Sequence, residues 1–179
     1  MANKNQQGVY NHDSLSNSET FFDKNKKAII IAVLAIIVII AGFFIYKAYV
    51  GGPREEKAST ELAKGQEYFN AEQFDKALNG DGAGFTGFVN IINNYGGTDA
   101  ANLANLYAGL SYANLNKWND AVKFLDEYSP SNDAMVSPAA LAALGNAYAH
   151  VNQLDKAITS LKKAADMADS EGKNGVNNS

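Results

Sequence analysis

Residues 28–46 form an unbroken run of nineteen uncharged, mostly apolar residues, AIIIAVLAIIVIIAGFFIY. As a helix rising ~1.5 Å per residue, the run would be roughly 28 Å long, close to the ~30 Å hydrocarbon core of a bilayer. Its apolar residues occupy every face, unlike those of an amphipathic surface helix. A buried core helix is one alternative, but the rest of the chain is too short to surround such a helix.

A cleaved signal peptide is the second alternative for this run. Signal peptides have a shorter apolar core of ~7–15 residues and end at a small-residue cleavage site. Here the run is longer, and Ala48-Tyr49-Val50 after Lys47 makes a poor cleavage site. The sequence therefore predicts an uncleaved signal anchor over residues 28–47, which makes this a single-pass membrane protein.

The segments that flank the run predict its orientation. Residues 1–27 are polar and predict a cytoplasmic tail that does not fold alone. Three lysines (24, 26 and 27) precede the run, whereas Lys47 and Arg54 follow it. This small excess of positive charge favours an N-terminus inside and a C-terminal domain outside. Residues 48–53 end in Gly-Gly-Pro and predict a hinge.

Composition limits the chemistry of the remaining chain. There is no cysteine, and the two histidines are His12 and His150. This excludes a disulfide scaffold, a thiolate metal site and a cysteine nucleophile, and we expect no metal, cofactor or small-molecule substrate. Residues 53–179 carry ten Lys and Arg against sixteen Asp and Glu, a net charge of −6. This charge disfavours binding to nucleic acid or to anionic lipid headgroups.

One pattern, Gly-x2-Tyr-x8-Ala, occurs three times at spacings of 44 and 36 residues. It predicts a helical hairpin: the glycine admits a neighbouring helix, the tyrosine lies on the same face, and the alanine lies where the second helix crosses the first. We expect these positions to pack the repeats together: Gly65, Tyr68 and Ala77; Gly109, Tyr112 and Ala121; Gly145, Tyr148 and Ala157.

The repeated pattern resembles the tetratricopeptide repeat (TPR) family, which implies hairpins over about 54–95, 102–135 and 138–169 within a domain at 54–169. The third copy matches best, with Leu161 and Ala164 at later family positions. The first departs most: a glycine-rich break at 79–84 precedes an expected further helix over about 85–95. The polar sequence of residues 170–179 predicts a loop or a truncation point rather than a capping helix. The expected fold class is all-α, one transmembrane helix followed by a TPR-type α-solenoid.

The resemblance also implies a partner-binding groove. TPR arrays bind a peptide or a helix on the concave face lined by the first helix of each hairpin. The family's positional pattern assigns to this face Leu62, Gln66, Phe69, Leu103, Leu106, Tyr107, Leu110, Asn114, Ala139, Ala142, Asn146 and His150. This set is mildly apolar and rich in small residues, which favours an amphipathic helix or an extended apolar segment as the partner.

The combined architecture is similar to that of bacterial inner-membrane TPR proteins, among them ancillary subunits of the Sec translocon that work with a membrane-anchored periplasmic chaperone. The resemblance implies a non-enzymatic module at the inner membrane with periplasmic repeats. The alternative is a general scaffold for an envelope assembly or regulatory complex, for which a cytoplasmic position of the repeats is also open. An enzyme is the third hypothesis, disfavoured because no catalytic cluster of Ser, His and Asp is present.

Overall fold

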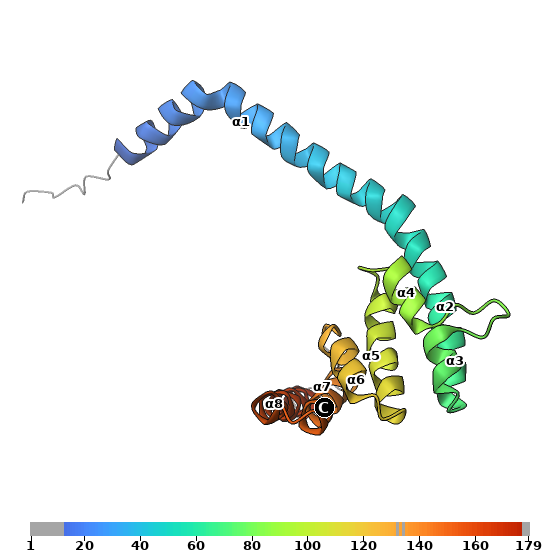
Figure 1. The fold of residues 1–179 in the computed structure, drawn as a ribbon. Coiled ribbons are helices and arrows are strands. Elements are labelled where there is room, and N and C mark those ends of the chain that lie inside the picture. Colours follow the sequence, from blue (N-terminus) through green and yellow to red (C-terminus); the bar gives the residue numbers. More distant parts are fainter. Residues whose placement is uncertain (1–12, 132, 134, 177–179) are drawn as a thin grey trace, which may run out of the picture. The chain divides into compact units, whose positions relative to one another are not determined.

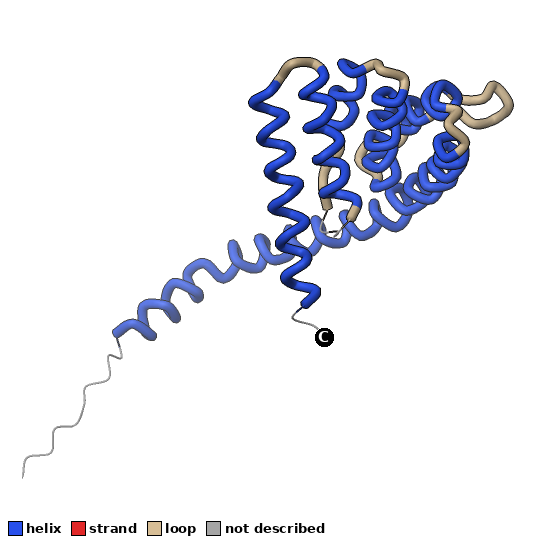
Figure 2. The backbone as a smooth tube through the Cα atoms, turned by 90° about the horizontal axis from the view of Figure 1, so that it is seen from below, coloured by secondary structure: helices blue, strands red, loops and turns tan. Residues whose placement is uncertain are grey.

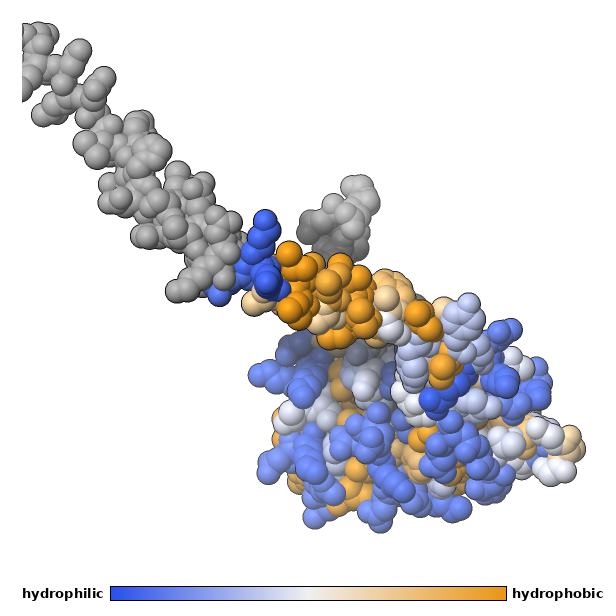
Figure 3. Space-filling model, turned by 90° about the horizontal axis from the view of Figure 1, so that it is seen from above, coloured by the Kyte–Doolittle hydropathy of each residue, from blue (hydrophilic) through white to orange (hydrophobic). Residues whose placement is uncertain are grey.

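The computed structural model describes residues 13–131, 133 and 135–176, and residues 1–49 and 50–179 form two compact units. The first unit contains α1 (Asp13–Tyr46), and its residues 31–46 are all exposed. Within the helical stretch Asn25–Asn70, an 18-residue window has a mean hydropathy of 3.4 and no buried part. In Figure 3 hydrophobic side chains (orange) cover most of the coloured part of α1, after a short hydrophilic stretch (blue). By length and composition this helix is able to cross a membrane or to act as a signal sequence.

Two local expectations around this helix differ from the structure. The predicted tail 1–27 is helical from Asp13 onwards, and its residues 1–12 lie outside the described part of the chain. The predicted hinge at 48–53 is also helical, because a π-helical turn (Lys47–Gly51) leads directly into the next helix at Gly52. Pro53 occupies the first turn of that helix and has no backbone N–H to donate to the turn before it.

Over its described residues, the second unit consists of helices joined by turns and loops, without strands (Figure 1). They are α2 (Gly52–Asn70), α3 (Phe74–Asn79), α4 (Phe88–Asn94), α5 (Asp99–Asn114), α6 (Trp118–Asp126), α7 (Val136–His150) and α8 (Leu154–Val176). Short turns join α2 to α3, α5 to α6, and α7 to α8, so the helices form successive hairpins (Figure 2). The all-helical fold predicted from the sequence is confirmed.

The three hairpin turns share one backbone geometry. Each contains a non-glycine residue with positive φ, at Glu72, Asn116 and Asn152, with φ between 56° and 59°. These positions repeat the spacing of the sequence pattern. In each turn the following amide donates to the carbonyl of the repeated tyrosine at 2.9 Å: Gln73 to Tyr68, Lys117 to Tyr112, and Gln153 to Tyr148. This hydrogen bond belongs to a Schellman-type helix end and starts the second helix at the same place in every hairpin.

The first hairpin is interrupted where the sequence predicts a break. Helix α3 ends at Asn79 and is followed by Gly80, whose φ of +94° favours glycine, and α4 begins at Phe88 rather than at Phe85. The loop between them is ordered around Asp81. Its carboxylate accepts hydrogen bonds from the amides of Ala83 and Phe85 and from the hydroxyl of Tyr68. The glycine-rich segment is therefore a fixed connection between α3 and α4.

The last helix is longer than expected. Residues 170–176, read from the sequence as part of a loop, continue α8 to Val176, and residues 177–179 lie outside the described chain. The apolar core lies between the hairpins in two clusters. One is centred on Phe88, Leu78 and Ile91, and the other on Leu125, Leu144 and Tyr148.

Candidate partner-binding surface

The first helices of the hairpins, α2, α5 and α7, carry a glycine at their crossing with a neighbouring element. A Cβ at Gly109 would lie 2.5 Å from Cγ of Leu125, and one at Gly145 would lie 2.7 Å from Cγ of Leu161. Both leucines come from the second helix of the same hairpin, four residues after the buried repeat alanine. These faces of α5 and α7 are thus filled by their own hairpins, and a partner has access only to the remaining faces.

Two residues assigned to the groove are buried instead. Leu62 and Leu106 are each 6% exposed and belong to the two core clusters. Leu106 packs in the cluster that includes Leu144 and Ala147 of α7, so the following hairpin covers it. The structure corrects the sequence assignment at both positions, because a side chain that closes the core offers no surface to a partner.

Half-buried side chains form the next layer of the expected groove. Phe69 and Tyr107 pack edge to face with ring centroids 5.2 Å apart, and Tyr107 also stacks on Phe88 at 5.6 Å. Leu103 contacts both core clusters, and Leu110 contacts the second. These four side chains are occupied mainly in joining hairpins, so a partner reaches only their edges.

The accessible residues of the expected groove are polar side chains and alanines rather than large apolar side chains. Asn114, Ala139, Asn146 and His150 are exposed, and Gln66 and Ala142 are half-buried. Carboxamides both donate and accept hydrogen bonds, so they match the N–H and C=O groups of an extended peptide. Flanking alanines allow a peptide backbone to come close. This chemistry fits a peptide main chain better than a purely apolar helix face.

His150 has a specific contact that the sequence pattern did not reveal. Its imidazole stacks on the indole of Trp118, with centroids 3.6 Å apart and planes 2° from parallel. Trp118 begins α6 and His150 ends α7, so the stack joins the turn ends of neighbouring hairpins. The only sequence signal was an aromatic residue and a histidine at the ends of helices in successive copies.

Two carboxylates cap helices and thereby position the surface. Glu55 of α2 accepts hydrogen bonds from the amides of Asp99 and Ala100 at 2.8 and 2.9 Å, at the N-terminus of α5. Asp133 accepts from the amides of Val136 and Ser137, at the start of α7, and from the Ser137 hydroxyl. The Ser137 hydrogen bonds are the main reason that the pKa of Asp133 lies well below its ordinary value. Such anionic caps stabilise helix N-termini.

A family profile described as a tetratricopeptide repeat-like domain matches residues 19–174, most of the chain. The chain belongs to this family. No curated protein and no solved structure matches it. The matched range includes the apolar run of α1 as well as the hairpins, so both segments are part of the family domain. Domains of this repeat type are generally protein-interaction modules without catalytic activity.

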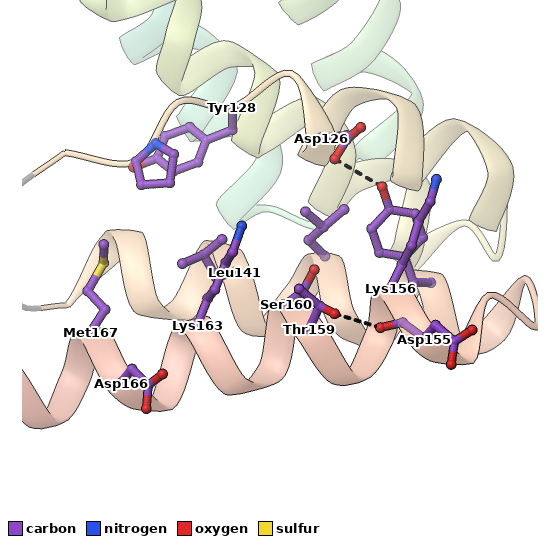
Figure 4. A pocket seen from close by; sticks show the side chains of 13 residues that line it. Asp126, Tyr128, Leu141, Asp155, Lys156, Thr159, Ser160, Lys163, Asp166 and Met167 are labelled. Carbon is purple, nitrogen blue, oxygen red and sulfur yellow. Dashed lines mark hydrogen bonds between the residues drawn. The ribbon is translucent and has the colours of Figure 1, made fainter.

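This TPR-like chain also has a cleft of about 630 Å³ bordered by α6, α7 and α8. Figure 4 shows Asp126 and Tyr128 on one side of it and Lys156 and Lys163 of α8 on the other. At one end of the cleft, the hydroxyl of Tyr148 donates a hydrogen bond of 2.9 Å to the carboxylate of Asp126. Burial, and then this hydrogen bond, raises the pKa of Tyr148. The cleft is lined by residues from three helices, so no local sequence motif marked it.

Among the described residues, no three His, Asp or Glu side chains gather closely enough to hold a metal ion. The acidic side chains of the glycine-rich loop and of the α7 cap accept hydrogen bonds from this chain's own backbone and hydroxyl groups. The surface is therefore able to bind a partner by hydrogen bonding and by complementary shape.

Proposed function

We propose that this protein is a membrane-tethered interaction module whose TPR-like repeats lie in the bacterial periplasm, beside the Sec translocon and its chaperone partners. The observation that carries the proposal is the family match over residues 19–174, which covers both a helix apolar enough to cross a membrane and a type of repeat that binds peptides. The inner membrane and an inside N-terminus are favoured by the lysines that precede the apolar run.

The mechanism in this proposal is passive capture. The repeats bind an extended segment through Gln66, Asn114 and Asn146, and the tether holds the repeats near the membrane. Confinement raises the effective concentration of the repeats for any polypeptide that leaves the membrane, without any additional contact. A protein emerging from a translocon presents unpaired main-chain N–H and C=O groups, which these carboxamides match.

Topology is the first part of the test, and the absence of cysteine makes it simple. Asn119 is exposed in the first turn of α6, so Asn119→Cys gives a single thiol on the repeat domain. We expect a membrane-impermeant maleimide to label this thiol in cells whose outer membrane alone has been permeabilised. Labelling only after lysis of the inner membrane contradicts the periplasmic assignment and favours the cytoplasm-facing scaffold.

Partner capture is the second part of the test. A photo-crosslinking amino acid at Asn146, which is exposed on α7, is compared with the same amino acid at Lys123, which is exposed on α6. We expect translocon subunits, periplasmic chaperones or secreted chains to crosslink from position 146 and not from position 123. Equal recovery from both positions contradicts the groove, and recovery of cytosolic proteins alone contradicts the secretion role.

A further inference from the structure

Helix α8 carries an exposed apolar stripe on its side away from the cleft. Leu154, Ile158 and Leu161 are 57%, 64% and 46% exposed. Their spacing of four and then three residues puts them on one face, which continues with exposed Ala165 and Ala168. In Figure 2, α8 leads to the C mark and is the outermost helix of the hairpin array.

The preceding hairpin shows what normally covers this face. Thirty-six residues earlier, the repeat-equivalent positions of α6 are Trp118, Val122 and Leu125. All three pack in the second core cluster, together with Leu144 and Ala147 of α7. The stripe on α8 is therefore equivalent to a face that α7 covers in the preceding hairpin. On α8, no helix of the described chain covers it.

We propose that a second copy of the chain covers this stripe, with the two α8 helices packed antiparallel about a two-fold axis. The stripe follows the alternating spacing of a coiled-coil seam. In the antiparallel arrangement Leu154 lies opposite Ala165 of the partner subunit, and Ile158 lies opposite Leu161 of the partner subunit. At each end of the interface a leucine therefore faces an alanine. In each of the two central layers an isoleucine faces a leucine.

Charge selects this register over its neighbour. Asp155 and Lys162 border the stripe on its outer side. In the proposed register Asp155 lies near Lys162 of the partner subunit, and the two-fold axis forms this pair twice. Sliding one helix by seven residues in one direction brings the two copies of Lys162 together and pairs Ile158 and Leu161 with alanines. Sliding it in the other direction brings the two copies of Asp155 together. Of these three registers, only the proposed one brings opposite charges together.

A second copy fits better than an unrelated helix because the stripe complements itself. One sequence supplies the large and small residues and the opposite charges at the positions that a two-fold axis relates, which is the requirement for an isologous interface. Exposed Ala149 and half-buried Ala142 on α7 are small as well, so the hairpin beside the stripe leaves room for the second copy. This inference does not depend on the proposed function.

The test measures self-association of the full chain by sedimentation equilibrium in density-matched detergent. We expect a dimer for the natural sequence and a monomer for Ile158→Glu, with unchanged far-UV circular dichroism because Ile158 is mostly exposed. A monomeric natural chain at all concentrations overturns the proposal. A dimer that persists in folded Ile158→Glu also overturns it, since the association would then come from another surface such as the apolar run.

Charge exchange tests the register. Lys162→Glu places like charges together and is expected to weaken dimerisation by about tenfold. Lys163→Glu makes the same change one residue along, on the side facing the cleft, and should leave the dimer unchanged. Combining Lys162→Glu with Asp155→Lys restores opposite charges and should restore the dimer. Equal effects of the two lysine variants, or failure of the double variant to recover, overturn the antiparallel register.

Discussion

Replacing Gly65 with alanine tests how the interrupted first hairpin is packed. In the other two hairpins a leucine of the second helix fills the space against the repeat glycine. In the first, the ring of Phe88 from α4 occupies that space. A Cβ at position 65 would lie 2.3 Å from Cε1 of Phe88 and 2.9 Å from Cζ of Phe85. Phe88 is fully buried and stacks on Tyr107, so its ring has little freedom to move away.

The magnitude follows from two opposing effects. Overpacking a tight core site costs about 1–3 kcal/mol, whereas replacing glycine by alanine inside a helix gains about 1 kcal/mol. The close approach to a fully buried ring puts the cost at the upper end of its range, so we expect Gly65→Ala to lower the free energy of unfolding by about 2 kcal/mol. Phe88→Leu alone should lower it by about 1–1.5 kcal/mol. The double variant should lose about 1 kcal/mol less than the sum, because leucine vacates the space that the new methyl group needs.

Urea unfolding of the full chain in detergent, followed through the single tryptophan, supplies the free energies. Trp118 stacks on His150 between the second and third hairpins, so its fluorescence reports on folding of the repeat unit. Gly96→Ala is the control, because a Cβ there meets only a carbonyl oxygen at 3.5 Å. Additive effects of Gly65→Ala and Phe88→Leu, within about 0.5 kcal/mol, would refute the shared contact.

Three further predictions concern caps and turns. Glu55→Ala removes the two hydrogen bonds that Glu55 accepts at the start of α5 and should lower the free energy of unfolding in urea by about 1 kcal/mol, whereas Glu56→Ala, exposed beside it, should have little effect. The hydroxyl of Tyr68, helped by two backbone amides, lowers the pKa of Asp81 from 3.8 to about 2, so its contribution to stability is present above pH 4 and lost as the pH falls towards 2. Asp81→Asn should therefore flatten the acid side of the stability–pH profile measured by thermal unfolding. Glu72 has a φ of 56°, a left-handed conformation that strains a side-chain-bearing residue and suits glycine, so Glu72→Gly should raise the melting temperature. An unchanged or lower melting temperature would contradict this backbone strain.

The sequence predicted the parts of the fold that repeat or that have uniform composition. The apolar run needs only its length to be recognised, and Gly-x2-Tyr-x8-Ala records contacts within one hairpin, between residues close in sequence. The turns at Glu72, Asn116 and Asn152 lie inside that short range, which explains why their positions follow the spacing of the pattern. A periodic signal of this kind does not depend on how successive hairpins pack.

The missed features depend on contacts between distant segments. Glu55 caps a helix that begins 44 residues later, and nothing local separates it from the exposed Glu56. Leu106 was assigned to the groove from its position in the repeat, but α7 packs over it and makes it part of the core. Phe88 replaces the usual second-helix leucine only because a loop ordered by Asp81 brings α4 back to α2.

The proposed tether and the proposed dimer through α8 would reinforce each other physically. Two soluble chains that associate through one helix face lose much of their translational and rotational freedom. Chains confined to a membrane by the proposed tether would already have lost part of that freedom, so a modest interface such as the α8 stripe would then be sufficient to hold them together. The proposed dimer would carry two repeat surfaces. A polypeptide with two binding segments would engage both, and its second contact forms at the effective concentration set by the dimer.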